Sequence, residues 1–229
     1  MFAGEEPVAM VMEWLSLTLE GMVKSKRKYA YKEIFQEILY GVDYLHSCGV
    51  VHRDLKPSNI MLGAKGGGSG PGSEPGEVRI GCSWVRVIVF VLERAVAWEG
   101  REMTNQVGSL YYRAPELLLG ERRYGSKVDV WSLGCIFYFM QTGSILFKGT
   151  SEVDQLRAIV SVLGAEAGQV GERTREGLAA MKVEGVAQNW NLIDKHLNEI
   201  EFDLLKKMIA LEPERRLSCK ELLFHPYFM

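Results

Sequence analysis

One short run of the 229-residue sequence brings together three side chains with complementary chemistry. The run is Val51-His-Arg-Asp-Leu-Lys-Pro-Ser-Asn59, in which Asp54 supplies a carboxylate, Lys56 an ammonium group and Asn59 an amide. A carboxylate can orient a hydroxyl, an ammonium group can neutralise a phosphate, and an amide oxygen can bind a hard metal ion. Pro57 stiffens the turn that carries them. The spacing therefore predicts phosphoryl transfer to a hydroxyl.

A second informative segment is Gly108-Ser-Leu-Tyr-Tyr-Arg-Ala-Pro-Glu116. Together, H-R-D-L-K-P-x-N in the first run and A-P-E in this one resemble the helical lobe of eukaryotic protein kinases. The resemblance implies a serine/threonine protein kinase that uses ATP and Mg²⁺ and acts on protein substrates. It implies that Asp54 orients the substrate hydroxyl, Lys56 contacts the γ-phosphate and Asn59 binds the metal ion. Ser109 stands where the family has a threonine that ties Asp54 to Lys56.

The same resemblance assigns structural roles to several charged residues. Glu116 is expected to form a buried ion pair with Arg216, and Asp129 is expected to steady the backbone of the catalytic loop. His52 is expected to be a packed, hydrogen-bonded core histidine. Arg53 is either a surface cation or the residue that receives an activation-loop phosphate. We assign no catalytic step to any of these five residues.

Finer features resemble the cyclin-dependent kinase branch of the family. They are Leu146–Leu156, Val162-Leu-Gly164 and His225-Pro-Tyr-Phe228. In that branch, Arg113 matches an arginine that favours a proline after the target serine or threonine. Thr104 has the spacing of an activating phosphothreonine, and a plain exposed threonine is the equally weighted alternative. The branch implies control of the cell cycle or of transcription, and a cyclin as one partner.

The segment Val11-Met-Glu-Trp-Leu15 resembles the hinge that binds adenine through main-chain hydrogen bonds. The resemblance implies that the carbonyl of Glu13 and the amide of Leu15 hold the base, with Met61 as the apolar floor of the site. From the residues alone, Val8–Met12 predicts only a short buried strand.

Hydrophobic periodicity predicts a mainly helical fold. Tyr31–His46 is apolar on one face, and Ser126–Thr142 is apolar almost all round, which is typical of a buried central helix. Glu201–Leu211 and Ser218–Phe224 predict two further helices. Capping boxes are predicted at three helix starts: Ser126…Asp129, Ser151…Asp154 and Ser218…Glu221. The expected fold class is mainly α (α+β), a protein-kinase-like C-terminal helical lobe with a short β ribbon.

Residues Gly63–Gly76 form a low-complexity stretch of glycine, proline and serine. Such a stretch can hold neither a helix nor a strand ladder. Strand-like runs flank it at Ile60–Leu62 and Glu77–Ile80. We therefore interpret it as the long turn of a hairpin, with a domain linker as the alternative.

The sequence departs from the family pattern in two places. Only Met1–Pro7 stands before the hinge, without the Gly-rich loop, the strand lysine or the cyclin-facing helix, so we expect the N-terminal β lobe to be largely absent. After Val78-Arg-Ile-Gly81, Cys82-Ser-Trp84 replaces the metal-binding D-F-G, and the apolar run Val85–Ala97 resembles no activation loop. A shifted reading frame or a retained intron would explain the second departure. The chain as given is expected to transfer phosphate weakly or not at all.

These features predict one protein kinase domain over residues 1–229, truncated at its N-terminus. Its expected parts are a hinge at about 11–15, a catalytic loop at 52–59, a Gly-rich insertion at 63–76, an activation and substrate loop at about 82–116 and a helical core at 126–229. The alternatives are a catalytically inactive interaction module, or an altered reading of a full kinase gene.

Composition sets wider limits on function. The net charge of −2 argues against nucleic-acid binding, which needs a basic surface. The longest apolar stretches fall short of the ~20 residues that a membrane span requires, and the N-terminus lacks a basic cluster typical of a secretory signal. The four cysteines contain no C-x-x-C pair, so we expect reduced thiols in the nucleus or the cytoplasm.

Overall fold

The structure is a computed structural model that describes residues 15, 17–25, 27, 29–62, 109–166 and 170–229, and the backbone of 85–87 and 96–97. The predicted strand at Val8–Met12 and the hinge carbonyl of Glu13 lie outside these ranges, as does Thr104. Helices dominate the described residues, which confirms the expected fold class at the level of a mainly helical domain with short strands.

The helices alternate with short 3₁₀ turns along the chain. The α-helices are α1 (Leu19–Lys24), α2 (Tyr31–Ser47), α3 (Pro115–Leu118), α4 (Lys127–Thr142), α5 (Glu152–Leu163), α6 (Glu172–Ala180), α7 (Glu199–Met208) and α8 (Cys219–Leu222). The 3₁₀ turns are η1 (Pro57–Asn59), η2 (Leu110–Tyr112), η3 (Trp190–Leu192), η4 (Asp194–His196), η5 (Pro213–Arg215) and η6 (Pro226–Phe228). The helices predicted at Tyr31–His46, Ser126–Thr142, Glu201–Leu211 and Ser218–Phe224 are confirmed as α2, α4, α7 and α8.

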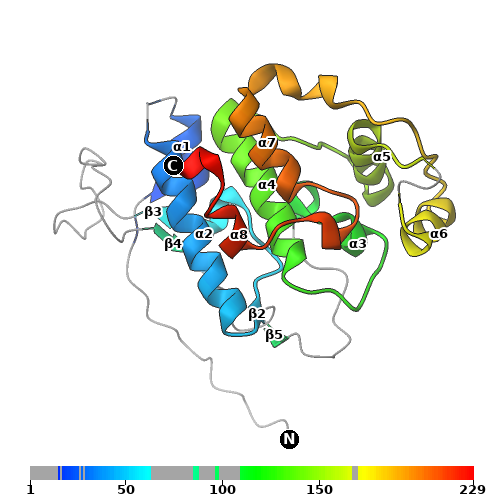
Figure 1. Ribbon diagram of the computed structural model, residues 1–229, viewed down its shortest axis with the longest axis horizontal. Coiled ribbons are helices and arrows are strands. Elements are labelled where there is room, and N and C mark those ends of the chain that lie inside the picture. The colour runs from blue at the N-terminus through cyan, green and yellow to red at the C-terminus, as the bar shows by residue number, and fades with distance from the viewer. Residues whose placement is uncertain are drawn as a thin grey trace, which may run out of the picture.

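Helix α4 is the centre of the core. Residues 128–140 are all buried, so the helix has no solvent-facing side over that length. Figure 1 shows α4 in the middle of the molecule, with α2 on one side and α7 on the other, and both of these helices contact it. Gly134 permits the close approach to α7, because a Cβ atom there would lie only 2.7 Å from Cγ1 of Ile209. Trp131 stacks on Phe147, with ring centroids 5.7 Å apart.

Among the described residues, the strands form two small antiparallel sheets. The strands are β1 (Leu17–Thr18), β2 (Val50–Val51), β3 (Ile60–Leu62), β4 (Val85–Val87) and β5 (Val96–Ala97). One sheet has the order β1-β3-β4, and the other pairs β2 with β5. Strands β2 and β3 flank residues 52–59, so both sheets hold the ends of the predicted catalytic loop.

The predicted hairpin is confirmed, but its second strand differs from the expected one. Ile60 pairs with Val87 and Leu62 with Val85, whereas Glu77–Ile80 lies outside the described residues. Val78-Arg-Ile and Val85-Arg-Val have the same alternation of apolar and charged residues, so a period of two cannot choose between them. The segment between the paired strands is therefore 63–84, longer than the predicted 63–76 insertion. The apolar run Val85–Ala97, placed by sequence in the activation segment, forms β4 and β5 at its two ends.

Helix capping agrees with the sequence at one of the three predicted boxes. Ser218 and Glu221 form the full reciprocal box of α8. At α5, Ser151 accepts the amide of Asp154. The carboxylate of Asp154 instead accepts from the Thr150 hydroxyl and the Arg157 guanidinium. The box predicted at Ser126 is wrong, because that side chain caps nothing. The full box at α7 begins with asparagine rather than serine (Asn198 and Glu201), and it was not predicted.

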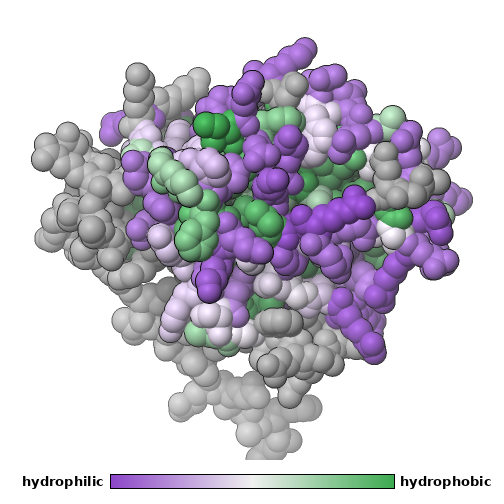
Figure 2. All heavy atoms as spheres, in the orientation of Figure 1, coloured by the Kyte–Doolittle hydropathy of each residue, from purple (hydrophilic) through white to green (hydrophobic). Residues whose placement is uncertain are grey.

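The visible surface of the described residues is mostly hydrophilic, and hydrophobic atoms show only in small separate areas (Figure 2). Within the part of the chain that the structure describes, no helix has the length and apolar character needed to span a membrane. The apolar side chains gather instead in one core cluster around α4.

Candidate active site

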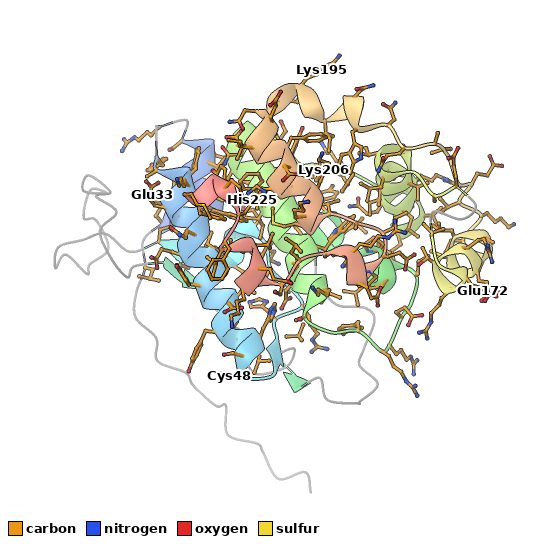
Figure 3. The ribbon with its side chains drawn as sticks, viewed as in Figure 1. Glu33, Cys48, Glu172, Lys195, Lys206 and His225 are labelled. Carbon is orange, nitrogen blue, oxygen red and sulfur yellow. The ribbon has the colours of Figure 1, made fainter. Side chains whose placement is uncertain are left out.

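The catalytic loop begins where helix α2 ends. Gly49 has a φ of +71°, a conformation that favours glycine, and it turns the chain from α2 into β2. Figure 3 shows Cys48 at this end of α2, while Glu33 marks the opposite end of the helix. Residues 52–56 then follow as irregular backbone, and η1 leads into β3. The loop is thus held between two strands and the end of a long helix.

A single buried carboxylate anchors the start of this loop. Asp129, in the first turn of α4, accepts the amides of His52 at 2.9 Å and Arg53 at 2.8 Å. It also accepts a hydrogen bond from Nε2 of His46, at 2.9 Å. Arg53 has a φ of +68°, which costs a non-glycine residue about 1–3 kcal/mol unless its surroundings hold it there. The two charge-assisted hydrogen bonds to Asp129 provide that restraint.

The four predicted catalytic side chains come together within hydrogen-bond distance. Oδ1 of Asp54 accepts the amide of Ser109 at 2.9 Å and lies 3.3 Å from its hydroxyl oxygen. Oδ2 of Asp54 lies 3.2 Å from Nζ of Lys56, which donates to the Ser109 hydroxyl at 3.0 Å. Asn59 donates through Nδ2 to the carbonyl of Asp54 at 2.8 Å and to Oδ2 at 3.3 Å. Two loops distant in sequence therefore meet at one carboxylate.

The donor set at this carboxylate fits a metal ion that arrives with its phosphates. Because Nδ2 of Asn59 donates to Asp54, the remaining amide oxygen of Asn59 is an acceptor suited to Mg²⁺. The described residues contain no cluster of three or more His, Cys, Asp or Glu side chains that could hold a metal ion. Mg²⁺ typically uses one or two protein oxygens together with phosphate and water. The residues therefore fit a Mg²⁺–nucleotide complex rather than a metal site made by protein alone.

The structure confirms the expectation for His52 and corrects one for Arg53. His52 is buried, and its Nδ1 accepts the amide of Asp54 at 3.2 Å, which confirms the expected core histidine. Arg53 is also buried, with only 5% of its surface exposed, so the surface-cation interpretation is wrong. Its guanidinium contacts the hydroxyl of Tyr124 at 3.3 Å.

The expected pair between Glu116 and Arg216 is present and buried. Nη1 and Nη2 of Arg216 donate to Oε1 and Oε2 of Glu116, at 2.7 and 2.8 Å. It also donates to the carbonyls of Ala210, Lys127 and Leu211. Such a network satisfies a charge that would otherwise cost several kcal/mol to bury. It joins α3 to the segment before α8 and holds the substrate loop against the helical core.

The remaining predicted residues have separate surroundings. Arg113 forms an ion pair with Glu152 at the start of α5, so its side chain ties the substrate loop to that helix. Leu15 and Met61 are both half-buried, and Met61 pairs with Thr18 in the β1–β3 ladder. The adenine-binding role of Leu15 and Met61 stays a prediction.

Three residues that support the site were missed. His46 binds Asp129 as described, and Tyr124 meets Arg53. Ser132 donates to the carbonyl of Tyr112 at 2.8 Å and so ties α4 to the substrate loop. For His46 and Ser132 the available signal was a polar side chain among the apolar residues of a helix, because buried polar groups need hydrogen-bond partners.

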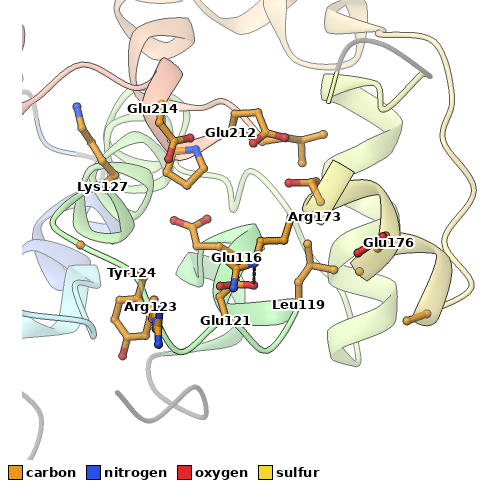
Figure 4. Close-up of a pocket in the computed structure, with 16 residues that line it drawn as sticks. Glu116, Leu119, Glu121, Arg123, Tyr124, Lys127, Arg173, Glu176, Glu212 and Glu214 are labelled. Atoms are coloured by element: carbon orange, nitrogen blue, oxygen red, sulfur yellow. Dashed lines mark ion pairs between the residues drawn. The ribbon is translucent and has the colours of Figure 1, made fainter. Parts of the chain in front are cut away.

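A cavity of about 880 Å³ lies on another side of the Glu116–Arg216 pair. It is bounded by α3, the start of α4, α6 and η5, and it contains none of the four catalytic side chains. Figure 4 shows the ion pair between Arg173 and Glu121 in this cavity. Nε of Arg173 lies 2.7 Å from Oε1 of Glu121. Glu176, Glu212 and Glu214 also line it. The cavity is therefore separate from the phosphoryl-transfer chemistry.

Comparison with known proteins agrees with this geometry. The protein kinase domain model matches residues 1–228, so the chain belongs to the protein kinase family. Its fold is similar to that of the yeast RNA Pol II CTD kinase CTDK-1 complex, with a TM-score of 0.78 and 25% sequence identity. That match covers 94% of this chain and 68% of the yeast chain. The chain is a cyclin-dependent-kinase-like protein kinase, as the sequence predicted.

The family match begins at residue 1, so it does not support the expected loss of the N-terminal β lobe. That expectation stays a prediction, as do the predicted boundaries of the hinge and of the activation and substrate loop.

Proposed function

We propose that this chain carries the phosphoryl-transfer site of a serine/threonine protein kinase. The observation that carries the proposal is the meeting of Lys56, Asn59 and Ser109 at the carboxylate of Asp54. Family membership supports a kinase, and the geometry supports this carboxylate as the group that orients the hydroxyl.

Each of these side chains has a distinct role in the proposed reaction. Asp54 accepts the proton of the substrate hydroxyl and directs its oxygen toward the phosphate. Lys56 lies beside Asp54 and Ser109, where its charge can stabilise the transferred phosphoryl group. Asn59 would hold Mg²⁺ through its amide oxygen. Mg²⁺–ATP, when bound, supplies the phosphoryl group and neutralises the charge on its phosphates.

The proposed substrates are proteins with serine or threonine followed by proline. Arg113, the residue that the resemblance connects with this preference, is held by Glu152 next to the Tyr112 carbonyl that Ser132 anchors. Phosphorylation of Thr104, a role in cell-cycle or transcription control, a cyclin partner, and a place in the nucleus or the cytoplasm belong to the same proposal.

Ser109 provides the test of the proposed site. Ser109→Ala removes the hydroxyl that Lys56 and Asp54 share, and we expect transfer to a Ser-Pro peptide to fall by about tenfold, the value of one charge-assisted hydrogen bond. Ser109→Thr keeps the hydroxyl and should keep most of the rate. Equal rates for the alanine variant and the unaltered chain would contradict the proposal, provided that both variants unfold at the same urea concentration.

A non-catalytic interaction module is the second candidate function. Two observations favour it: Cys82-Ser-Trp84 stands in place of D-F-G, and the separate cavity has several carboxylates. Five glutamates and three cations line the cavity, so its lining has a net negative charge. The charge favours a partner segment with lysine or arginine.

Two measurements separate the candidates. Millimolar Mg²⁺–ATP should raise the melting temperature if the nucleotide binds, because binding stabilises the folded state by RT ln(1 + [L]/Kd). A fluorescent peptide rich in lysine and arginine should bind the unaltered chain more tightly than Glu214→Lys if the cavity is a docking site. A melting temperature that is unchanged by ATP, together with charge-dependent peptide binding, would favour the second candidate.

A further inference from the structure

A cysteine, a histidine and an aspartate from three different helices meet below the catalytic loop. Cys219 is the first residue of α8, His46 lies in the last turn of α2, and Asp129 lies in the first turn of α4. Sγ of Cys219 is 3.8 Å from Nδ1 of His46, and Nε2 of His46 is 2.9 Å from Oδ2 of Asp129. Cys219 and Asp129 have no exposed surface, and the His46 side chain is 12% exposed.

The acceptors around the imidazole ring determine where its proton lies. The carboxylate of Asp129 only accepts hydrogen bonds, so Nε2 of His46 must carry a proton to bind it. In a neutral ring Nδ1 is then an acceptor, and the group that faces it is the thiol of Cys219. The thiol can donate, because burial and the charges of Asp129 and Asp43 raise its pKa more than Lys127 lowers it.

We propose that Cys219 is a positioning residue of the catalytic loop. Its thiol donates to Nδ1 of His46 and so keeps the proton of the ring on Nε2, where it binds Asp129. Asp129 in turn holds the amides of His52 and Arg53. The opposite tautomer would turn a nitrogen lone pair toward the carboxylate, and the anchor of the loop would weaken. Only the consequence for catalysis rests on the proposed kinase function.

Nitrogen-15 NMR of the His46 ring tests the proposal directly. In the unaltered chain at neutral pH, Nδ1 should have the chemical shift of an unprotonated nitrogen and Nε2 that of a protonated one. Cys219→Ala should shift the Nδ1 signal and introduce the second tautomer, whereas Cys219→Ser, which keeps a donor, should restore the original pattern. Cys135→Ala is the matched control, because Cys135 is equally buried but lies within α4 away from His46.

The second readout is hydrogen exchange at the amides of His52 and Arg53. Cys219→Ala should speed exchange at both by about two- to fivefold, the loss expected for one weak hydrogen bond, while Cys219→Ser and Cys135→Ala should leave it unchanged. A protonated Nδ1 in the unaltered chain would overturn the proposal. So would a Cys219→Ala variant with unchanged ring signals and unchanged exchange. Neither readout uses phosphate transfer, so failure of the kinase function would leave both results interpretable.

Discussion

Asp129 lies at a helix start, but its carboxylate anchors the backbone of the catalytic loop. Its carboxylate accepts two loop amides and the His46 ring, and it has no exposed surface. Loss of the carboxylate would remove an acceptor from each of these three donors. An unsatisfied buried polar group costs about 1–3 kcal/mol.

Asp129→Asn should therefore destabilise the fold by about 2–4 kcal/mol, because the amide nitrogen must face one of the three donors. Urea unfolding measures the change. Asp154→Asn is the matched control, since Asp154 occupies the same position in the first turn of α5 but its side chain is 43% exposed. Its cost should be under about 1 kcal/mol. Equal losses of unfolding free energy in the two variants would contradict the role of Asp129 as the anchor of the loop.

Asp203 and His225 provide a pH-dependent contribution to stability. The hydrogen bond from His225 lowers the pKa of Asp203 below its ordinary value of 3.8, and Lys207 and Lys206 act in the same direction. Figure 3 shows His225 near the middle of the view, between α2 and α7. A carboxyl group with a lowered pKa in the folded state stabilises the fold above pH 3.8, and that stability is lost as the pH falls through the lowered value.

The free energy of unfolding should thus decrease as the pH falls from 6 to 3. The free energy of unfolding of the Asp203→Asn variant should decrease less over the same interval. Urea titrations of both proteins at the two pH values measure this difference. Parallel losses in the two proteins would mean that the Asp203–His225 pair does not contribute to the acid sensitivity.

Helix starts show how one sequence pattern can lead to two outcomes. Ser126…Asp129 and Ser218…Glu221 have the same spacing, but only Ser218 caps its helix. Asp129 is engaged by the catalytic loop, whereas Glu221 accepts from the backbone and hydroxyl of Ser218, which lowers the pKa of Glu221. The local signal is therefore overruled where a tertiary partner takes the carboxylate.

Ser218→Ala should cost about 1 kcal/mol of stability through loss of the cap. Ser126→Ala, the control, should change the stability by less than about 0.5 kcal/mol, since its hydroxyl caps nothing. The urea midpoints of the two variants test this ranking. A larger loss for Ser126→Ala than for Ser218→Ala would contradict the assignment of the caps.

The long elements were predictable because their hydrophobic patterns are strong and local. Helix α2 buries Ile34, Phe35, Ile38, Leu39 and Val42, which lie at helical spacing in the sequence. Strand β4 was not predictable, because the two candidate tripeptides alternate identically. Likewise, the burial of Arg53 depends on Tyr124 and Asp129, which come from a distant part of the chain.

On the scale of the whole molecule, the site depends on contacts between distant segments. Ser109 reaches Asp54 from another loop, and Arg216 binds Glu116 from near the C-terminus. Motif resemblance could predict these meetings, because it carries information about three-dimensional neighbours that periodicity lacks. Glu13 of the predicted hinge and Thr104 lie outside the described residues, so their roles stay predictions. The D-F-G departure leads us to expect a low absolute rate of transfer.

Phosphate transfer that depends on Asp54 is the most direct test of the central claim. Labelled Mg²⁺–ATP and a Ser-Pro peptide should give slow but measurable transfer with the unaltered chain. Asp54→Asn should lower the rate at least about 100-fold, because it removes the group that accepts the hydroxyl proton, while Asp154→Asn should not lower it. Transfer that persists unchanged in Asp54→Asn, or no transfer by the unaltered chain at millimolar ATP, would contradict the assignment of this site.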